Sequence, residues 1–448
     1  MMQRAGRPDS STSTRAELGR AFPSTHIWVN AMLSRLIAVM FIALLALPVL
    51  GSAAGASQQT GLRPLQPLID AAKPNDKIVL DPGTYAGPIV IDKPLTLDGQ
   101  GKATIDAGGT GSVITLKTQG AVVRNLHLIN SGELHNNLDA GVQVRGMFNI
   151  VEDNVIEDCL FGVDLAKSDY NIVRRNHISS KPFELGMRGD AIRLWYSFNN
   201  KVTDNVINNS RDTVVWYSKD NLIARNKASN SRYSLHFMYS QHNKVIGNEY
   251  YHNSVGIFLM YSDGIELRDN TVIRSVGSTG MGIGYKETSG VTAIGNKILY
   301  CSTGIYSDVS PYQPDSTNIF KNNLIAYSSI GIRFHNDWHG NIFTDNSFEG
   351  NITQIGVEGA DTAIHNTWKG NYWDDYEGFD RDHNGIGDTP YELYSYADRL
   401  WLDVPPAQFF KGSPMLEVLD FLERLAPFSP PALVLRDKVP LMSPKAKR

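Results

Sequence analysis

Short runs of alternating apolar and polar residues fill most of the chain, and asparagine marks these runs at regular intervals. Between residues 149 and 371 the pattern Asn-x4-Asn recurs, beginning with Asn149 and Asn154 and ending with Asn366 and Asn371. From one unit to the next, the second asparagine advances by 21 to 29 residues, most often by 22. A period of this length is typical of one coil of a β-solenoid, because a single coil buries its apolar face only by stacking on its neighbours.

A short strand begins eight residues after the second asparagine of many units, as in Gly256–Met260. Because successive side chains of a strand alternate, we expect Ile257 and Leu259 to point inward and Phe258 and Met260 to point outward. Another strand surrounds each asparagine pair, whose amides suit tight turns and can bond to the amide of the next coil. These patterns predict an all-β protein, a right-handed parallel β-helix (solenoid) with about 22 residues per coil.

Three segments follow from where the repeat begins and ends. Residues 1–56 are expected to form a leader and a cleaved signal peptide, because Arg35 precedes an apolar run at Leu36–Leu50 and small residues follow that run. A membrane anchor is the alternative, but a membrane span needs about 20 apolar residues. Residues 57–371 are assigned to the parallel β-helix, and its short N-terminal cap is expected to be a helix at Gly61–Asp70.

Residues 372–448 are expected to form an irregular and helical C-terminal extension, with an amphipathic helix at Pro414–Leu425. The extension also contains an acidic loop, whose candidate Ca²⁺ ligands are Asp380, Asp382, Asn384 and Asp388. They stand at positions 1, 3, 5 and 9 of an EF-hand-type loop, with Gly385 at position 6. The spacing predicts a structural Ca²⁺ site, although Tyr391 replaces the bidentate Glu of position 12. An Asp- and Gly-rich surface turn is the alternative.

The two cysteines test the register of the coils. Cys159 lies five residues after Asn154 and Cys301 lies five residues after Asn296, so both occupy one column, six coils apart. At about 4.8 Å per coil their separation is roughly 29 Å, which is far beyond the reach of a disulfide. We therefore expect two free, buried thiols.

Composition and charge narrow the range of functions. The chain has 448 residues and a net charge of −4, so no nucleic-acid partner is expected, since such binding requires a basic face. Parallel β-helix enzymes that act on acidic polysaccharides need clustered carboxylates with Lys, Arg or His on an outer face. The outward columns do not present this pattern, so we expect a protein that is not an enzyme. A lyase- or epimerase-like enzyme and a non-catalytic structural β-helix are the alternatives.

One outward column is unusual because it carries large apolar side chains. Its members are Trp195, Trp216, Met238 and Met260. His236 lies two residues before Met238 on the same face, and His242 lies in the next turn. Thioether and imidazole groups suit Cu(I), a soft ion. The copper candidates are therefore His236, Met238, Met260 and His242. Alternatively, Trp195, Trp216 and Phe258 form a dry patch that docks a partner or a covering loop.

Two stretches carry a resemblance to a known family. Asn366–Tyr376 reads NTWKGNYWDDY and is followed by Gly378–Asp380 and Asp388–Tyr391, while Arg232–Ser240 reads RYSLHFMYS. These stretches resemble the C-terminal signature and the central His-x-Met-Tyr segment of the NosD family. The repeats also resemble the carbohydrate-binding and sugar-hydrolase (CASH) type of β-helix repeat, which many functions share. With the signal peptide, the resemblance covers nearly all of the mature chain.

This resemblance implies a periplasmic, non-catalytic maturation factor of denitrification. Members of the family work with an ABC transporter, whose membrane and ATPase subunits are separate chains, and they take part in copper-site assembly of nitrous oxide reductase. The resemblance also implies that a copper chaperone lipoprotein delivers the copper, which is held transiently. His236 and Met238 are the candidates that match the family segment best.

Overall fold

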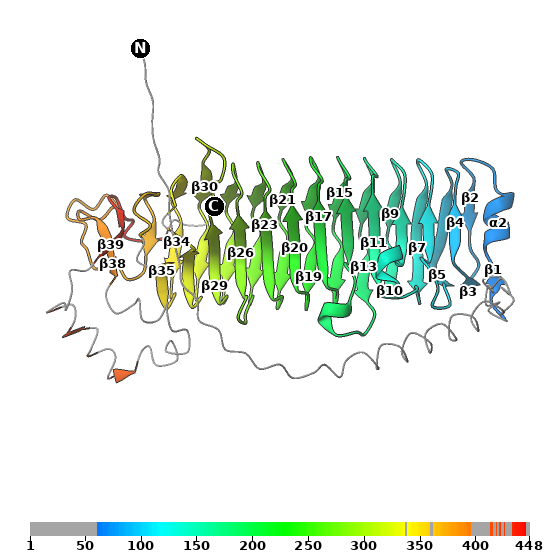
Figure 1. Ribbon diagram of the computed structural model, residues 1–448, viewed down its shortest axis with the longest axis horizontal. Coiled ribbons are helices and arrows are strands. Elements are labelled where there is room, and N and C mark those ends of the chain that lie inside the picture. The colour runs from blue at the N-terminus through cyan, green and yellow to red at the C-terminus, as the bar shows by residue number, and fades with distance from the viewer. Residues whose placement is uncertain are drawn as a thin grey trace, which may run out of the picture. The chain divides into compact units, whose positions relative to one another are not determined.

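The computed structural model describes residues 61–336, 338–358, 362–395 and 432–444, and the single positions 413, 414, 418, 421, 422 and 425. Over these residues the chain winds into a stack of parallel β-coils, from blue at the N-terminal side to orange at the C-terminal side (Figure 1). The predicted fold class, an all-β parallel β-helix, is confirmed. The predicted leader and signal peptide, residues 1–56, lie outside the described residues.

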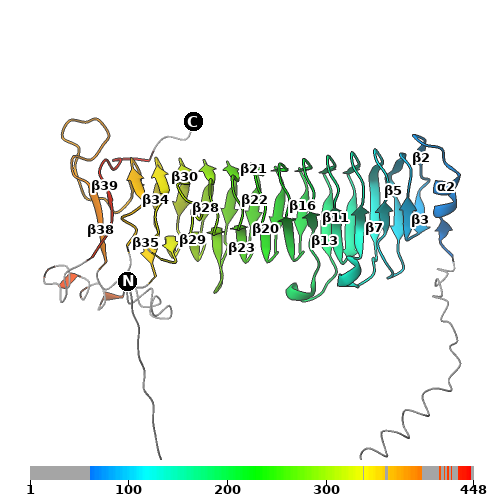
Figure 2. The same ribbon diagram turned by 45° about the horizontal axis from the view of Figure 1, so that its top comes forward.

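Most coils contribute three short strands, and equivalent strands of successive coils pair in parallel (Figure 2). One sheet has 12 strands: β4 (Ile89–Ile91), β6 (Ile114–Leu116), β8 (Ala140–Val144), β11 (Phe161–Ala166), β14 (Ile192–Trp195), β17 (Asp212–Trp216), β20 (Tyr233–Met238), β23 (Val255–Met260), β26 (Met281–Lys286), β29 (Thr303–Asp308), β32 (Ile330–Phe334) and β35 (Thr353–Val357). This sheet, called the site sheet below, carries the unusual outward column.

The other strands of the coils belong to a second, 25-stranded sheet with two faces. The strands between the paired asparagines and their counterparts are β2 (Lys77–Val79), β9 (Ile150–Glu152), β12 (Ile172–Arg174), β15 (Lys201–Thr203), β18 (Leu222–Ala224), β21 (Lys244–Ile246), β24 (Glu266–Arg268), β27 (Thr292–Ile294), β30 (Asn318–Lys321), β33 (Asn341–Thr344) and β36 (Thr367–Lys369). The strands that follow them are β1 (Arg63–Pro64), β3 (Gly83–Ala86), β10 (Val155–Cys159), β13 (His177–Ser180), β16 (Val206–Asn208), β19 (Lys227–Ser229), β22 (Glu249–Tyr251), β25 (Thr271–Ile273), β28 (Lys297–Leu299), β31 (Leu324–Ala326), β34 (Ser347–Glu349) and β37 (Tyr372–Trp373). Two long strands, β5 (Thr96–Asp106) and β7 (Val122–Ile129), pair along both faces.

The asparagines form hydrogen-bonded ladders from coil to coil. Oδ1 of Asn226 accepts from the backbone N and the Nδ2 of Asn205 at 3.0 and 2.9 Å, and Asn226 donates in the same way to Asn248. Nδ2 of Asn226 also donates to the carbonyl of Val202. Because a buried amide is costly unless it is paired, each rung satisfies the polar corner of its coil. The predicted amide-to-amide bonding is confirmed.

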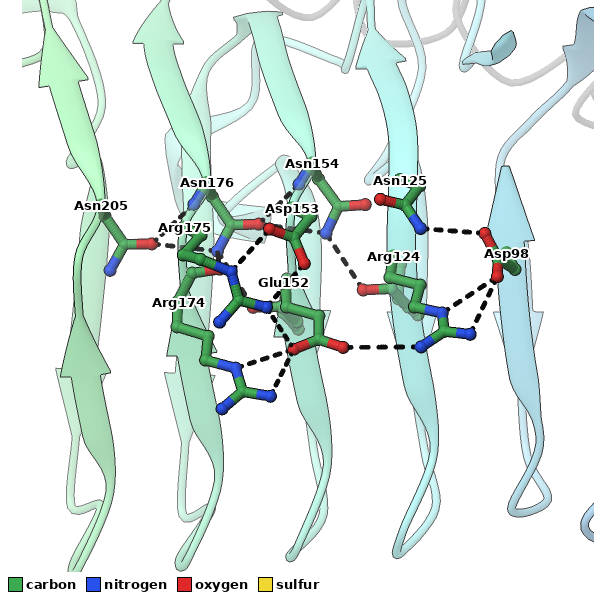
Figure 3. A network of polar contacts seen from close by, with 12 residues as sticks. Asp98, Arg124, Asn125, Glu152, Asp153, Asn154, Arg174, Arg175, Asn176 and Asn205 are labelled. Carbon is green, nitrogen blue, oxygen red and sulfur yellow. Dashed lines mark hydrogen bonds and ion pairs between the residues drawn. The ribbon is translucent and has the colours of Figure 1, made fainter. Parts of the chain in front are cut away.

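Charged side chains also pair from coil to coil, beside this ladder (Figure 3). Arg124 donates to Asp98 at 3.0 Å and lies 3.9 Å from Glu152, which in turn pairs with Arg174 and Arg175. Asp98 and Glu152 are themselves buried, at 6% exposure each, and pairing with arginine offsets the cost of burying their charge. The network thus engages these carboxylates with arginines of neighbouring coils.

The interior confirms the predicted alternation and the state of the cysteines. Ile257 and Leu259 are fully buried in the core. Cys159 and Cys301 are free and buried. Cys159 is the last residue of β10, and Cys301 lies two residues after the end of β28. Burial raises the pKa of the Cys159 thiol to about 12 and that of Cys301 to about 11.

Two of the longer coils carry loops with short 3₁₀ turns, η1 (His135–Asn137) and η2 (Leu185–Met187). Lys181 links them, since its Nζ lies 3.9 Å from Glu133 in the first loop and 3.4 Å from Asp158. Leu138 and Phe183, one from each loop, pack against the same small apolar cluster. The loops therefore lie side by side.

The two ends of the solenoid are covered differently. At the N-terminal end the expected helix is α2 (Gln66–Ala71), whose Gln66 side chain bonds to both backbone groups of Val90. At the C-terminal end, β38 (Tyr391–Ser395) and β39 (Ala432–Asp437) pair antiparallel. The ring of Tyr391 stacks on Trp373 of the last coil at 4.5 Å. This contact extends the aromatic core beyond the repeats.

Only part of the predicted amphipathic helix belongs to the described residues. Pro414, Val418, Phe421, Leu422 and Leu425 are all helical, and the other positions between 414 and 425 lie outside the described residues. The four large apolar side chains of this set are 53–66% exposed. No helix in the part of the chain that the structure describes is long and apolar enough to cross a membrane.

Candidate metal site on the site sheet

The outward side chains of β17, β20 and β23 form a small grid on the site sheet. Its rows of register partners are Val214–His236–Phe258 and Trp216–Met238–Met260. Because the two rows are two residues apart along each strand, all six side chains lie on one outer face. The grid brings three of the four copper candidates onto neighbouring coils.

His236 and Met260 meet across the boundary between two coils. Nε2 of His236 lies 3.3 Å from Sδ of Met260, although the register partner of His236 is Phe258. The Met260 side chain therefore reaches diagonally back toward the preceding coil. His236 is only 6% exposed, and its Nδ1 has no hydrogen-bond partner within the described ranges. An unpaired nitrogen on a buried imidazole is unusual, since buried polar atoms are normally paired.

Aromatic rings enclose the imidazole. Tyr233 stacks on it with ring centroids 4.8 Å apart, Trp216 meets it at a right angle at 5.8 Å, and Phe258 is tilted against it at 6.1 Å. Burial among these rings lowers the pKa of His236 to about 4. The imidazole is therefore neutral near pH 7, and neutral imidazole is the form that binds metal ions.

The contact has a geometry that one metal ion can share. The two atoms are 3.3 Å apart. An ion bound to Nε2 at about 2.0 Å and to Sδ at about 2.3 Å would therefore have an angle of about 100° between the two bonds. That angle suits a tetrahedral or distorted trigonal ion. An imidazole and a thioether are soft to intermediate ligands, which favour Cu(I) over hard cations. Among the described residues, no three His, Cys, Asp or Glu side chains gather to hold a metal, so a site here depends on methionine sulfur.

Two further methionines lie near the contact. Met238 is the register partner of Met260 and is partly exposed on the same face as His236. Met281 lies one coil further on, and its sulfur approaches the backbone of Gly284. A Cβ at Gly284 would lie only 2.6 Å from Sδ of Met281 and 2.3 Å from the ring of Phe258. The bare backbone of Gly284 thus makes room for both side chains. Met238, on the strand of His236 and in register with Met260, is the candidate for a further sulfur ligand.

His242, the fourth copper candidate, lies apart from this contact. It occupies the turn after β20, its side chain is 66% exposed, and its Nδ1 is 4.0 Å from Asp220. The chain turns a corner at Tyr239, whose φ is +50°, so the residues after Met238 leave the site face. The structure therefore brings His236, Met238 and Met260 together and places His242 in a different environment.

The three docking candidates differ in how much surface they offer. Trp195 and Trp216 are partly exposed and pack edge to face at 5.9 Å, and Arg193 lies over the ring of Trp195. Phe258 is 9% exposed, because it packs down onto Gly284. Most of the candidate docking surface therefore comes from the two tryptophans.

A stack of tyrosines runs along the corner beside the candidate ligands. Its rings lie 4.8 to 5.2 Å apart, and its members are Tyr196, Tyr217, Tyr239 and Tyr261. Each follows directly a member of the outward column and precedes a serine. The Tyr-Ser dipeptide that recurs in four successive coils is the signal from which this stack could have been predicted.

The acidic loop closes on its own backbone. The carboxylate of Asp380 accepts from the backbone N of Gly385 at 2.8 Å and of Asn384 at 3.1 Å. Asp382 accepts from the side chain of Asn384, and Asp388 accepts from the backbone N of Arg381. Hydrogen bonds from Gly385 and its neighbours lower the pKa of Asp380, outweighing the opposing effect of desolvation. The four candidate ligands thus belong to one turn, but they do not converge as a group of three carboxylates.

Comparison with known proteins gives the chain its family. Residues 180–378 match the family model described as periplasmic copper-binding protein (NosD), and residues 102–210 match that of the right-handed β-helix region. The A-module of mannuronan C-5 epimerase AlgE6 from Azotobacter vinelandii has a similar structure, with a TM-score of 0.50 and 15% identity. It aligns over 67% of this chain and 92% of its own length, and the likeness shows the fold alone.

Two curated relatives carry the name probable ABC transporter binding protein NosD. The one from Stutzerimonas stutzeri is 35% identical over 111 residues, which is 25% of this chain and 26% of the relative. The one from Pseudomonas aeruginosa is 31% identical over 432 residues, which is 89% of this chain and 94% of the relative. With this identity over nearly the full length of both proteins, the chain belongs to the NosD family.

Proposed function

We propose that this chain is a periplasmic, non-catalytic copper-handling protein that holds Cu(I) transiently on the site sheet during maturation of nitrous oxide reductase. The observation that carries the proposal is the 3.3 Å contact between Nε2 of His236 and Sδ of Met260 in an aromatic pocket. Met238, on the same strand as His236 and in register with Met260, supplies a further thioether. This ligand set suits a soft ion that is received and passed on, and it offers no hard ligand to Ca²⁺ or Mg²⁺.

The family supports the location and the partners in this proposal. The matching family model is described as a periplasmic copper-binding protein, and the curated relatives are named as ABC transporter binding proteins. We propose that this chain receives copper from a copper chaperone lipoprotein and supports its delivery to nitrous oxide reductase. The membrane and ATPase subunits of the associated ABC transporter are separate chains.

Two apolar surfaces are suited to these partners. Trp195 and Trp216 lie beside Met238, where a protein that exchanges copper would approach. The exposed apolar positions of the C-terminal helix are more than 30 residues beyond the last coil, and we propose that they face the transporter. A structural Ca²⁺ in the acidic loop, held by Asp380 and its neighbours, stays a separate proposal.

The test is an anaerobic Cu(I) titration of the mature chain, residues 57–448, against a competing chelator. We expect His236→Ala and Met260→Leu to weaken Cu(I) binding by at least tenfold, since each removes one ligand of the ion. Two matched controls are His242→Gln, which changes a histidine on another turn, and Met187→Leu, which changes a 61% exposed thioether in a loop. Equal losses in the controls, or no Cu(I) binding by the wild type, would refute the proposed site.

A further inference from the structure

The imidazole of His236 is supported by contacts that begin at a buried carboxylate. Asp212, whose side chain is fully buried, accepts from Nε of Arg232 and from the backbone N of Tyr233, both at 3.0 Å. A second guanidinium nitrogen of Arg232 also bonds to Asp212. The guanidinium lies 5.0 Å from the centroid of the Tyr233 ring, and that ring stacks on His236 at 4.8 Å and 21°. One carboxylate thus fixes both the backbone and the cationic neighbour of Tyr233.

We propose that Tyr233, supported by Arg232 and Asp212, is a positioning residue that holds His236 ready for one soft, singly charged metal ion. This inference rests on the proposed copper function and adds to it the residues that set the orientation of the ligand and the choice of ion.

The first reason is that His236 lacks the usual orienting partner. In most metal sites, the second imidazole nitrogen donates to a carboxylate or a carbonyl, and that hydrogen bond fixes the ring. Nδ1 of His236 has no such partner in the described part of the chain. Packing must therefore fix the ring, and the stacked ring of Tyr233 with the perpendicular ring of Trp216 restricts its rotation. The result is that Nε2 faces Sδ of Met260 before any ion arrives.

The second reason concerns charge. The carboxylate of Asp212 is already engaged by Arg232 and the backbone of Tyr233, and Arg211 lies 3.6 Å from it. This carboxylate is therefore not available as a hard ligand. Arg232 and Asp212 form a closed ion pair, so the pair leaves no free carboxylate oxygen beside His236. An imidazole and thioethers without an anionic oxygen ligand favour Cu(I) or Ag(I) over Zn(II).

The test compares Tyr233→Leu with Tyr233→Phe in the mature chain. The Phe variant keeps the stacked ring, whereas the Leu variant removes it. Tyr300→Leu is the control for loss of a stacked tyrosine elsewhere on the solenoid, since Tyr300 stacks on Tyr327 at 5.1 Å. Two properties are measured: anaerobic Cu(I) and Ag(I) affinity by chelator competition, and the ¹⁵N and ¹H signals of the His236 ring in the metal-free protein.

We expect Tyr233→Leu to weaken Cu(I) and Ag(I) binding by about tenfold, the usual cost of losing a supporting residue of a metal site. We also expect its imidazole signals to broaden or split, while Tyr233→Phe and Tyr300→Leu resemble the wild type. A ring equally ordered in Tyr233→Leu, or unchanged Ag(I) affinity, would overturn the positioning role even if the wild type binds Cu(I). Displacement of Ag(I) by equimolar Zn(II) would overturn the selectivity.

The two measurements separate this inference from the copper function on which it rests. If the wild type binds neither Cu(I) nor Ag(I), the proposed function fails. The ring signals of the metal-free variants then still show whether Tyr233 fixes His236, because that readout requires no ion.

Discussion

Asp437 takes the place of the next asparagine above Asn371, because its carboxylate accepts from both the backbone N and the Nδ2 of Asn371 at 2.9 Å each. The preceding rung has the same two bonds, from Asn346 to Asn371. Each rung presents N–H donors toward the C-terminal end, so the last rung would leave donors without acceptors. A buried anion from β39 meets them there.

Replacing Asp437 is expected to loosen the C-terminal end of the solenoid. Asp437→Ala leaves the buried donors of Asn371 unpaired, which should lower the free energy of unfolding by about 3 kcal/mol. Asp437→Asn keeps an acceptor oxygen and should cost less. Urea unfolding together with hydrogen exchange at β36 and β37 measures both effects. An Asn variant as unstable as the Ala variant would contradict this account of the cap.

A substitution in the middle of the ladder tests the other rungs. Asn226→Ala removes the acceptor for Asn205 and the donor to Val202, both of which are buried. We expect a loss of about 2–4 kcal/mol in the free energy of unfolding. The exposed Asn208, on strand β16 of the preceding coil and without a positive φ, is the matched control, and Asn208→Ala should change stability by less than about 1 kcal/mol. Similar losses at both positions would mean that the ladder is not the source of the stability.

The low pKa of His236 predicts a dependence of stability on pH. Burial brings it to about 4 in the folded chain, whereas an unfolded histidine titrates near 6.5. Between these values the unfolded state binds the proton and the folded state does not. The stability from this group is therefore present above about pH 6.5 and is lost as the pH falls toward 4, by at most about 1.4 kcal/mol per pH unit.

The measurement is the difference in unfolding free energy between the wild type and His236→Phe at several pH values. The difference is needed because Asp190 acts in the opposite sense, since burial raises its pKa to about 6. The stability from Asp190 is lost as the pH rises through 6, and it cancels when both chains contain Asp190. A difference that does not change between pH 4 and 6.5 would show that His236 is not buried in neutral form.

The cysteines should be inert in the folded protein. Burial raises the pKa of both thiols, so little thiolate forms near neutral pH, and thiolate is the reactive species. We expect a thiol reagent to label neither Cys159 nor Cys301 until denaturant is added, and then to label both. Intact mass without a reductant should show two free thiols. Fast labelling of the native chain would place a cysteine at the surface.

The sequence predicted the coil register and the shared face of the candidate ligands, because the asparagine period and strand alternation determine both. It could not predict the contact between His236 and Met260, which depends on a side-chain rotamer that crosses to the preceding coil. Tyr233 was missed for a different reason. It lies three residues before His236, and regular alternation would put the two on opposite faces. The register of β17 against β20 shifts between Asp212 and Val214, and the two rings meet.

The asparagine ladder keeps the faces of successive coils aligned even where the coils differ in length. Consecutive rungs are 29 residues apart from Asn171 to Asn200 and 21 apart from Asn200 to Asn221. The site sheet nevertheless keeps its pairing through both steps, as Leu165, Leu194 and Val215 show. Loops can therefore grow, shrink or be exchanged at the corners without moving the site sheet. The scaffold is modular: new partner-binding loops can be grafted beside an unchanged site.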